Sequence, residues 1–460
     1  MLLIKNGYVM DPKSQGEGIK DILIEDNKVI AIGNNLPVNM LLVNYPQVSM
    51  KELEIIDATG LVVAPGLVDV HVHFRDPGFT YKEDIETGAK AAAKGGYTTV
   101  VLMANTKPAV DNLETLNYIL EKGASTDIHV KTCCTVTKGM LGKELSSMEE
   151  LKDHGASGFT DDGIPIMDEA LVREAMIRTR RLGVPISFHE ENPALIENNG
   201  INKGRASEFY KIGGSPREAE IDFIKRDLEI ALETDAIINI QHISSKEAVE
   251  LVRIAKKRSN NIHCEASPHH FTLTEESLIE KGTLAKMNPP LRTQEDRLAI
   301  IEGLKDGTID LIATDHAPHS KEEKERSILD APSGIIGLET ALSLGITELV
   351  AKGYLSMMEL IKKMSYNPSN MYGFDCGRIE KGCTADFVIF NEKETWTVES
   401  FISKSANSPF LGETLNGVVM YTICDGKIIY QNKVAKEEEL KSGTDEKSEC
   451  SGISTNRESI

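Results

Sequence analysis

The sequence has no excess of basic residues. It contains 51 Lys and Arg against 71 Asp and Glu, which gives a formal net charge of −20 at pH 7. A surface that binds nucleic acid needs clustered positive charge, so this balance argues against a nucleic-acid partner and favours solubility. An acidic balance carries no information about the fold.

Long apolar runs and a cysteine framework are also missing. The apolar residues at the start give way to polar ones at Lys5, which is too short a stretch for a signal peptide, and no run approaches the roughly 20 residues that span a bilayer. The seven cysteines show no regular spacing and no Cys-x-x-Cys pair. We therefore expect reduced, mostly buried thiols and a cytoplasmic protein without membrane contact.

With 460 residues and 40% hydrophobic content, the chain is long enough for one large domain and a smaller one. From Gly66 onward, short β-branched runs alternate with segments of helical periodicity. The candidate strands are 67–73, 97–103, 128–133, 156–160, 184–188, 236–241, 262–266 and 310–314. Their number and their apolar character predict an α/β fold, a TIM (β/α)8 barrel over residues 63–375.

The two ends of the chain have a different pattern. Residues 1–62 and 376–434 contain short strands separated by Gly and Asn, which predicts one small β domain built from both ends. Residues 38–53 resemble an insertion. Residues 435–460 are polar without apolar periodicity, so we expect a disordered tail.

Two histidines spaced i, i+2 close the first barrel strand, in Asp69-Val-His71-Val-His73. Side chains alternate across a strand, so both imidazoles point the same way and could bind one metal ion. Taken alone, this pair fits two core or surface histidines equally well.

Further ligand-type residues follow other strands of the predicted barrel. Catalytic groups of such barrels lie at the carboxyl ends of the strands, so these side chains are expected to converge. Four imidazoles and two carboxylates suit zinc, and are enough for two ions that share a bridging carboxylate. The candidate metal ligands are His71, His73, His189, His242, Asp315 and one of the pair Asp161-Asp162, for which we take Asp162. If these six residues were unrelated buried polar groups, all six would have to lie at strand ends by coincidence.

Asp315 ends the eighth candidate strand, where a carboxylate can both bind metal and act as the catalytic general base. The neighbouring His316 fits a packed or supporting histidine better than a ligand. Arg75 presents a planar fork that matches a carboxylate, so we group it with Asn105, Asn288 and His319 as a substrate clamp.

Five motifs together resemble the long-chain bacterial dihydroorotases of the amidohydrolase superfamily. They are DVHVHFRDPG, FTDDG, CEASPHHFTLTE, KMNPPLRTQEDR and ATDHAPH, and the resemblance covers most of 60–375. It implies reversible, zinc-dependent interconversion of dihydroorotate and carbamoyl aspartate in pyrimidine synthesis. The terminal segments fit the small β domain of that family more loosely.

The resemblance also implies residue roles. His71 and His73 would bind one zinc, His189 and His242 the other, and Asp162 would bridge the two ions. Asp315 would be ligand and general base. The expected substrate contacts are His73, Arg75, Asn105, Asn288 and His319, with the backbone of Ser333 and Gly334 closing over the ring.

Some positions depart from the family pattern. The chain reads His189-Glu190-Glu191-Asn192 where relatives often have His-Cys-Glu-Asp, and Ala104 replaces a usual proline. No lysine stands beside Asp161-Asp162, which favours a dihydroorotase over a hydantoinase or allantoinase with a carboxylated lysine. A non-catalytic scaffold subunit of aspartate transcarbamoylase is the third alternative, and it would have lost metal ligands. A homodimer and an association with aspartate transcarbamoylase stay open as partner predictions.

Overall fold

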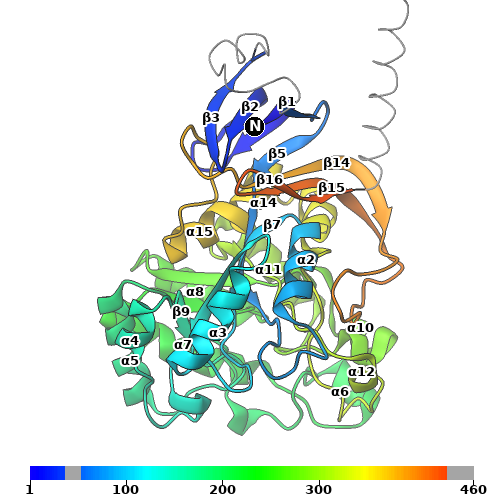
Figure 1. The fold of residues 1–460 in the computed structure, drawn as a ribbon. Helices are drawn as coiled ribbons and strands as arrows, with labels where there is room; N and C mark the ends of the chain where they lie inside the picture. Colours follow the sequence, from blue (N-terminus) through cyan, green and yellow to red (C-terminus); the bar gives the residue numbers. More distant parts are fainter. Residues whose placement is uncertain (37–52, 433–460) are drawn as a thin grey trace, which may run out of the picture.

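The computed structural model describes residues 1–36 and 53–432. Two eight-stranded sheets make up the molecule, a terminal sheet at the top of Figure 1 and a helix-covered barrel below it. The expected tail at 435–460, and all of the expected insertion except its last residue, lie outside the described residues. Within the described ranges, no helix is long and apolar enough to cross a membrane.

The barrel sheet is parallel throughout and follows the chain order from β6 to β13. Its first and last strands are linked by the buried Asp69 carboxylate, which accepts the Thr314 N–H at 3.2 Å, and by a bridge between Val72 and His316. The strands are β6 (Leu67–Val72), β7 (Tyr97–Leu102), β8 (His129–Cys134), β9 (Gly158–Thr160), β10 (Ile186–Phe188), β11 (Ile238–Ile240), β12 (Ile262–Ala266) and β13 (Leu311–Ile312). The predicted fold class is confirmed.

The helices outside the barrel form for local reasons that α2 (Ile85–Lys94) illustrates. Asp84 caps its first turn, and its apolar residues Ile85, Ala89 and Ala92 lie in the barrel core. The other long helices are α3 (Leu113–Gly123), α5 (Glu169–Leu182), α7 (Arg217–Thr234), α8 (Lys246–Lys256) and α11 (Gln294–Asp306).

Shorter helices connect these elements and build the loops around the barrel. They are η2 (Lys138–Met140), α4 (Met148–Asp153), η3 (Pro193–Leu195), α6 (Arg205–Tyr210), α9 (Pro268–Thr272), α10 (Glu275–Lys281), η4 (Gly282–Ala285), α12 (Lys321–Lys324), α13 (Ala341–Gly345), η5 (Ile346–Val350), α14 (Met357–Ile361), η6 (Lys362–Tyr366) and α15 (Asn367–Tyr372).

The terminal sheet combines both ends of the chain. Its strand order is β16-β15-β14-β5-β1-β2-β3, with β4 paired to β1, and the two ends meet where β14 runs antiparallel to β5. The strands are β1 (Leu2–Asp11), β2 (Gly16–Glu25), β3 (Lys28–Gly33), β4 (Glu54–Asp57), β5 (Val62–Pro65), β14 (Phe387–Thr397), β15 (Thr414–Cys424) and β16 (Lys427–Gln431). This sheet has its own apolar core.

The terminal sheet contacts the amino ends of the barrel strands. Asp386 illustrates the contact, because its carbonyl accepts the Gly66 N–H just before β6 and its carboxylate lies 3.1 Å from Nε2 of His129 on β8. The opposite end of the barrel is therefore left for the candidate site.

Candidate metal and substrate site

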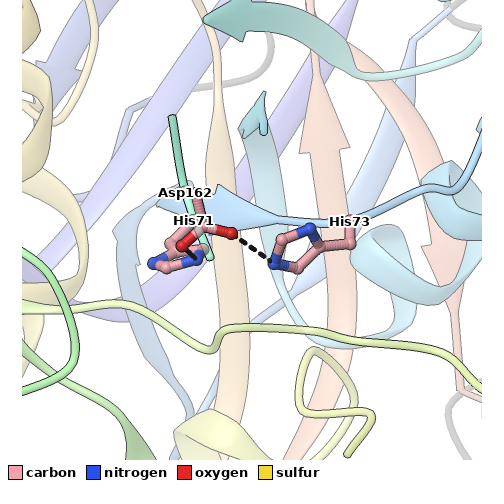
Figure 2. Close-up of side chains that lie close together, drawn as sticks. All are labelled: His71, His73 and Asp162. Atoms are coloured by element: carbon pink, nitrogen blue, oxygen red, sulfur yellow. Dashed lines mark ion pairs between the residues drawn. The ribbon is translucent and has the colours of Figure 1, made fainter. Parts of the chain in front are cut away.

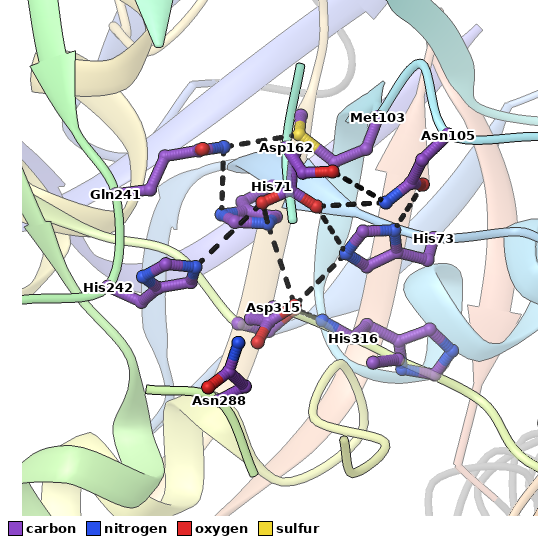
Figure 3. Close-up of polar contacts among 12 residues, drawn as sticks. His71, His73, Met103, Asn105, Asp162, Gln241, His242, Asn288, Asp315 and His316 are labelled. Atoms are coloured by element: carbon purple, nitrogen blue, oxygen red, sulfur yellow. Dashed lines mark hydrogen bonds and ion pairs between the residues drawn. The ribbon is translucent and has the colours of Figure 1, made fainter. Parts of the chain in front are cut away.

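The six candidate ligands converge at the carboxyl ends of five barrel strands, and Figure 3 labels all of them except His189. His71 lies on β6 and His73 directly follows it, and one each follows β9, β10, β11 and β13. Each residue is at most 7% exposed, and the set is His71, His73, Asp162, His189, His242 and Asp315. Three residues of this region have a left-handed backbone, since φ is 58° at Arg75, 31° at His242 and 49° at Asp315.

One group of ligand atoms lies around the end of β6 (Figure 2). Asp162 approaches Nε2 of His71 at 3.5 Å and Nε2 of His73 at 3.4 Å. Asp315 lies on the same side, with Oδ1 at 3.1 Å from His73 Nε2 and 3.5 Å from His71 Nε2. Two nitrogens and two carboxylates therefore face a common point.

A second group lies beside the first and shares one member with it. Nδ1 of His189 and Nε2 of His242 are 3.0 Å apart, and each is 3.8 Å from Oδ1 of Asp162. Asp162 thus belongs to both groups of potential metal ligands. This position is the one that a bridging carboxylate would occupy.

The outer nitrogens of three histidines are held by hydrogen bonds that set their tautomers. His71 Nδ1–H donates to Glu265 at 2.5 Å, His73 Nδ1–H to the Asn105 carbonyl at 3.0 Å, and His189 Nε2–H to Glu191 at 3.1 Å. The other nitrogen of each ring points to the centre, where a bound metal ion would take the place of its proton.

The charges of the site are mutually dependent. Burial would lower the pKa of His71, but Glu265, Asp162 and Asp315 outweigh it and raise that pKa well above its ordinary value. Burial likewise opposes the charge on Asp162, yet His71 and the neighbouring imidazoles hold its pKa well below the usual range. Its carboxylate is therefore ionised.

The residues fit a metal centre. Nε2 of His71 and Nδ1 of His242 are buried and have no hydrogen-bond partner, although such atoms are normally satisfied. A donor set of imidazole nitrogens and carboxylate oxygens suits zinc and similar divalent ions. Metal ions at the two groups would also balance the buried carboxylates.

Two neighbours of the candidate ligands support the backbone instead. Asp161 accepts the Val136 N–H at 2.8 Å and that of Thr137 at 3.2 Å, so its carboxylate is used by the loop after β8. His316 accepts the Gly337 N–H on Nδ1 at 3.1 Å. Asp161 and His316 therefore hold neighbouring loops in place, as their predicted supporting roles require.

A cavity of about 420 Å³ opens over the ligands and contains the expected substrate contacts. Its walls include His73, Arg75, Asn105, Asn288, His319, Ser333 and Gly334. Arg75 donates from Nε to the Pro318 carbonyl at 3.3 Å. Burial is the main cause that lowers its pKa, and its half-buried guanidinium lies at the cavity wall.

His319 is already engaged in this arrangement. Its Nε2–H donates to the Ser333 carbonyl at 2.8 Å, and Nδ1 lies 3.4 Å from the Lys82 ammonium. Burial, followed by Arg75 and Lys82, lowers the pKa of the ring, which is therefore neutral. In this structure His319 holds the loop at Ser333 and has no free N–H for a carboxylate.

Sequence reasoning missed the carboxylates that orient the histidines. Glu265 and Glu191 are both 2% exposed or less, and each binds an imidazole. Glu265 had a detectable signal, since it is a carboxylate between Cys264 and Ala266 near the carboxyl end of the predicted strand 262–266. Glu191 lies in a polar tetrapeptide and offered none.

Residues 62–429 match the model of the amidohydrolase family. Among curated proteins, a dihydroorotase of Clostridioides difficile (strain 630) is 57% identical over 430 residues, which are 94% of this chain and all of that protein. A dihydroorotase of Clostridium acetobutylicum is 51% identical over 435 residues, again 94% of this chain and all of the relative. The chain belongs to the dihydroorotase branch of the amidohydrolase family.

Solved amidohydrolase structures agree with the barrel. The L-hydantoinase from Arthrobacter aurescens superposes with a TM-score of 0.81 at 25% identity, covering 94% of this chain and 96% of that one. The dihydropyrimidinase from Brevibacillus agri NCHU1002 gives 0.80 at 24% identity over 94% and 95% of the two chains, which shows the shared fold. The predictions of a dihydroorotase relative and of a cyclic amide hydrolase are confirmed.

Proposed function

We propose that the chain hydrolyses dihydroorotate reversibly to N-carbamoyl-aspartate with two zinc ions. The observation that carries this proposal is the placement of Asp162 in both ligand groups, beside a cavity lined by the half-buried Arg75. The first group would hold one ion through His71 and His73, and the second would hold the other through His189 and His242. When bound, the ions supply Lewis acidity to the amide carbonyl and to the attacking water.

Asp315 is the proposed general base. Burial would raise its pKa, but His71 and His73 outweigh this effect and keep the pKa below the ordinary value. The carboxylate is therefore ionised and can take a proton from the attacking water. It then returns that proton to the ring nitrogen when the amide C–N bond breaks. In the reverse direction the same group removes the proton from the ureido nitrogen.

Arg75 is the proposed determinant of substrate class. Among the described residues the half-buried Arg75 guanidinium forms no ion pair, and the substrate carboxylate would supply a bidentate partner. Asn105 and Asn288 line the same cavity and would bind the polar edge of the ring. A neutral cyclic amide would leave the Arg75 charge unmatched, which distinguishes a dihydroorotase from a hydantoinase.

The test compares kcat/KM for dihydroorotate with that for neutral dihydrouracil. We expect the wild type to prefer the acid strongly, and Arg75→Ala to remove most of that preference because a charge-assisted pair is lost. Arg75→Lys should recover only part, since a point charge lacks the planar fork. Equal hydrolysis of both substrates by the wild type would reject the proposal in favour of a hydantoinase-like activity.

The presence of all six candidate ligands at one place argues against a non-catalytic scaffold subunit. The cytoplasmic location, the homodimer and the association with aspartate transcarbamoylase stay predictions. The zinc identity and the count of two ions are part of the proposal, and metal analysis of the purified protein tests them.

A further inference from the structure

The loop 328–334 forms one wall of the candidate cavity. Leu329, Ala331, Pro332, Ser333 and Gly334 all line the cavity, although the loop belongs to no helix or strand. A loop without regular backbone pairing needs other partners for its carbonyl groups. For the carbonyls of residues 328, 329, 331, 332 and 334, those partners include the side chains of two lysines.

Lys286 lies on the segment that also carries Asn288, and its side chain extends under the loop. Its ammonium group is within hydrogen-bond distance of three loop carbonyls, those of Ile328 at 2.7 Å, Leu329 at 3.2 Å and Ala331 at 2.8 Å. The three N–H donors of one ammonium group are thus matched by three acceptors.

Lys324 ends α12 and reaches the other half of the loop. Its ammonium group contacts the carbonyls of Pro332 at 2.9 Å and Gly334 at 3.1 Å, and that of Lys286 at 3.4 Å. The Lys286 carbonyl also accepts the Gly334 N–H at 2.9 Å. The two lysines and the loop therefore form one connected unit.

These two ammonium groups are unusual in their surroundings. Each lysine is 4% exposed, and neither forms an ion pair within the described ranges 1–36 and 53–432. Burial without a carboxylate is costly and lowers the pKa of both residues. Backbone carbonyls offset this cost only while the loop stays in place, so each lysine favours this one loop conformation.

The loop position in turn controls residues that face the substrate. The Ser333 carbonyl accepts the His319 Nε2–H, and the Gly334 carbonyl also accepts an N–H of Asn407 at 3.0 Å. Gly334 has a φ of 126°, and a Cβ there would approach Ala317 Cβ to 2.7 Å. A shift of the loop would therefore displace His319 and the adjoining wall.

We propose that Lys286 and Lys324 are positioning residues that hold loop 328–334 in the conformation that binds substrate. The inference rests on the proposed function and deepens it, because it assigns the shape of the substrate pocket to two lysines that are not candidate metal ligands. Lys286 itself borders the cavity, whereas Lys324 does not line it and acts only through the loop. Binding should therefore suffer more than chemistry.

The experiment replaces each lysine by methionine, which has similar length but cannot donate. We expect Lys286→Met and Lys324→Met to raise KM for dihydroorotate at least about tenfold, with kcat reduced much less, because a misplaced wall weakens binding. The matched control is Lys321→Met on the same helix, whose side chain is 82% exposed, and it should behave as wild type. Lys286→Gln keeps N–H donors without the charge, so it should give a KM between those of wild type and Lys286→Met. It also replaces Lys286→Met in the test if that variant does not fold.

Two further readouts separate anchoring from simple charge attraction. Amide hydrogen exchange of 328–334 in the substrate-free protein should accelerate in both methionine variants and not in Lys321→Met. The rise in KM should persist at about 0.5 M salt, where attraction between exposed charges is screened. Unchanged exchange in this loop, or a KM difference that disappears in salt, would overturn the inference. Failure of the wild type to act on dihydroorotate would reject the proposed function instead, while the exchange result would still decide the anchoring.

Discussion

The two ends of the barrel differ in the groups that they bury. At the carboxyl ends of the strands, two ionised carboxylates and four imidazoles are buried together, and some of their atoms have no hydrogen-bond partner. At the amino ends, the barrel domain meets the terminal sheet through apolar contacts and hydrogen bonds, such as the one from Thr422 Oγ1 on β15 to the Ala93 carbonyl of α2 at 2.6 Å. Function and stability are thus assigned to opposite ends of the same strands.

The difference predicts opposite responses to substitution. Residues at the carboxyl end should affect activity with little loss of stability, because their buried charges do not stabilise the fold without metal. Residues at the amino end should affect stability and leave the activity of the folded fraction unchanged. The predictions that follow test this separation, beginning with the largest effect.

Asp315→Asn should have the largest effect. The change is nearly isosteric, so the fold should persist, but the proton acceptor is lost and kcat/KM should fall at least ~10²-fold. Assays in both directions and a melting temperature measured on the same sample test this. Activity within threefold of wild type would remove Asp315 from the role of base.

Strand β12 offers a matched pair of histidine–carboxylate contacts, one at each end. Glu265 binds His71 at the carboxyl end, and Asp310 binds His263 at 2.7 Å at the amino end. Glu265→Gln should weaken metal affinity by roughly 10–100-fold, because the partner that orients His71 is lost. Asp310→Asn should leave metal affinity unchanged. If the two variants have equal metal affinities in a chelator competition, the carboxyl and amino ends of the barrel do not differ in function as proposed.

Gly96 lies where the barrel packs on β14, with a φ of 88°, and a Cβ there would approach Val388 Cγ2 to 2.6 Å. Gly96→Ala should therefore lower the free energy of unfolding by ~1–3 kcal/mol. Gly183→Ala is the control, because its φ is also positive, at 66°, but its Cβ would meet nothing within 4 Å. We expect a smaller loss of unfolding free energy for Gly183→Ala, and the difference between the two variants measures the cost of the clash with Val388. The kcat/KM per folded molecule should match wild type in both variants.

His129 supplies the smallest expected effect. Its hydrogen bond to Asp386, more than the opposing burial, raises its pKa above the ordinary value. A raised folded-state pKa means that the pair stabilises the protein below the unfolded pKa, near 6.5, and that this stabilisation is lost as pH rises through the folded-state value. His129→Gln should therefore cost less than ~1 kcal/mol at pH 5.5, and the difference in melting temperature should shrink toward pH 9. A difference that grows with pH would contradict the assignment.

The barrel could be predicted from the sequence because its strands are apolar on both faces. All eight expected strands lie within two residues of the observed ends, and β12 agrees at both ends. The candidate ligands were equally accessible to prediction, since the topology of a parallel barrel brings strand ends together whatever the sequence distance between them.

Contacts between side chains from distant segments could not be predicted. The choice of Asp162 over Asp161 depended on resemblance, whereas the structure separates the two by which one the loop after β8 uses. The lysines under loop 328–334 gave no signal, because a lysine that binds backbone carbonyls has the same spacing as an exposed one. His319 was expected to clamp substrate, and its bond to Ser333 depends on a loop conformation that no periodicity encodes.

We propose that one site at the carboxyl ends of the barrel strands holds two metal ions through a shared Asp162. Metal content per folded subunit, measured by plasma emission, tests it most directly. We expect about two ions in the wild type and about one in both His71→Ala and His189→Ala. His263→Ala, at the amino end of β12, should retain the wild-type content. A wild-type content of one ion, with His189→Ala at the same stoichiometry, would contradict the claim.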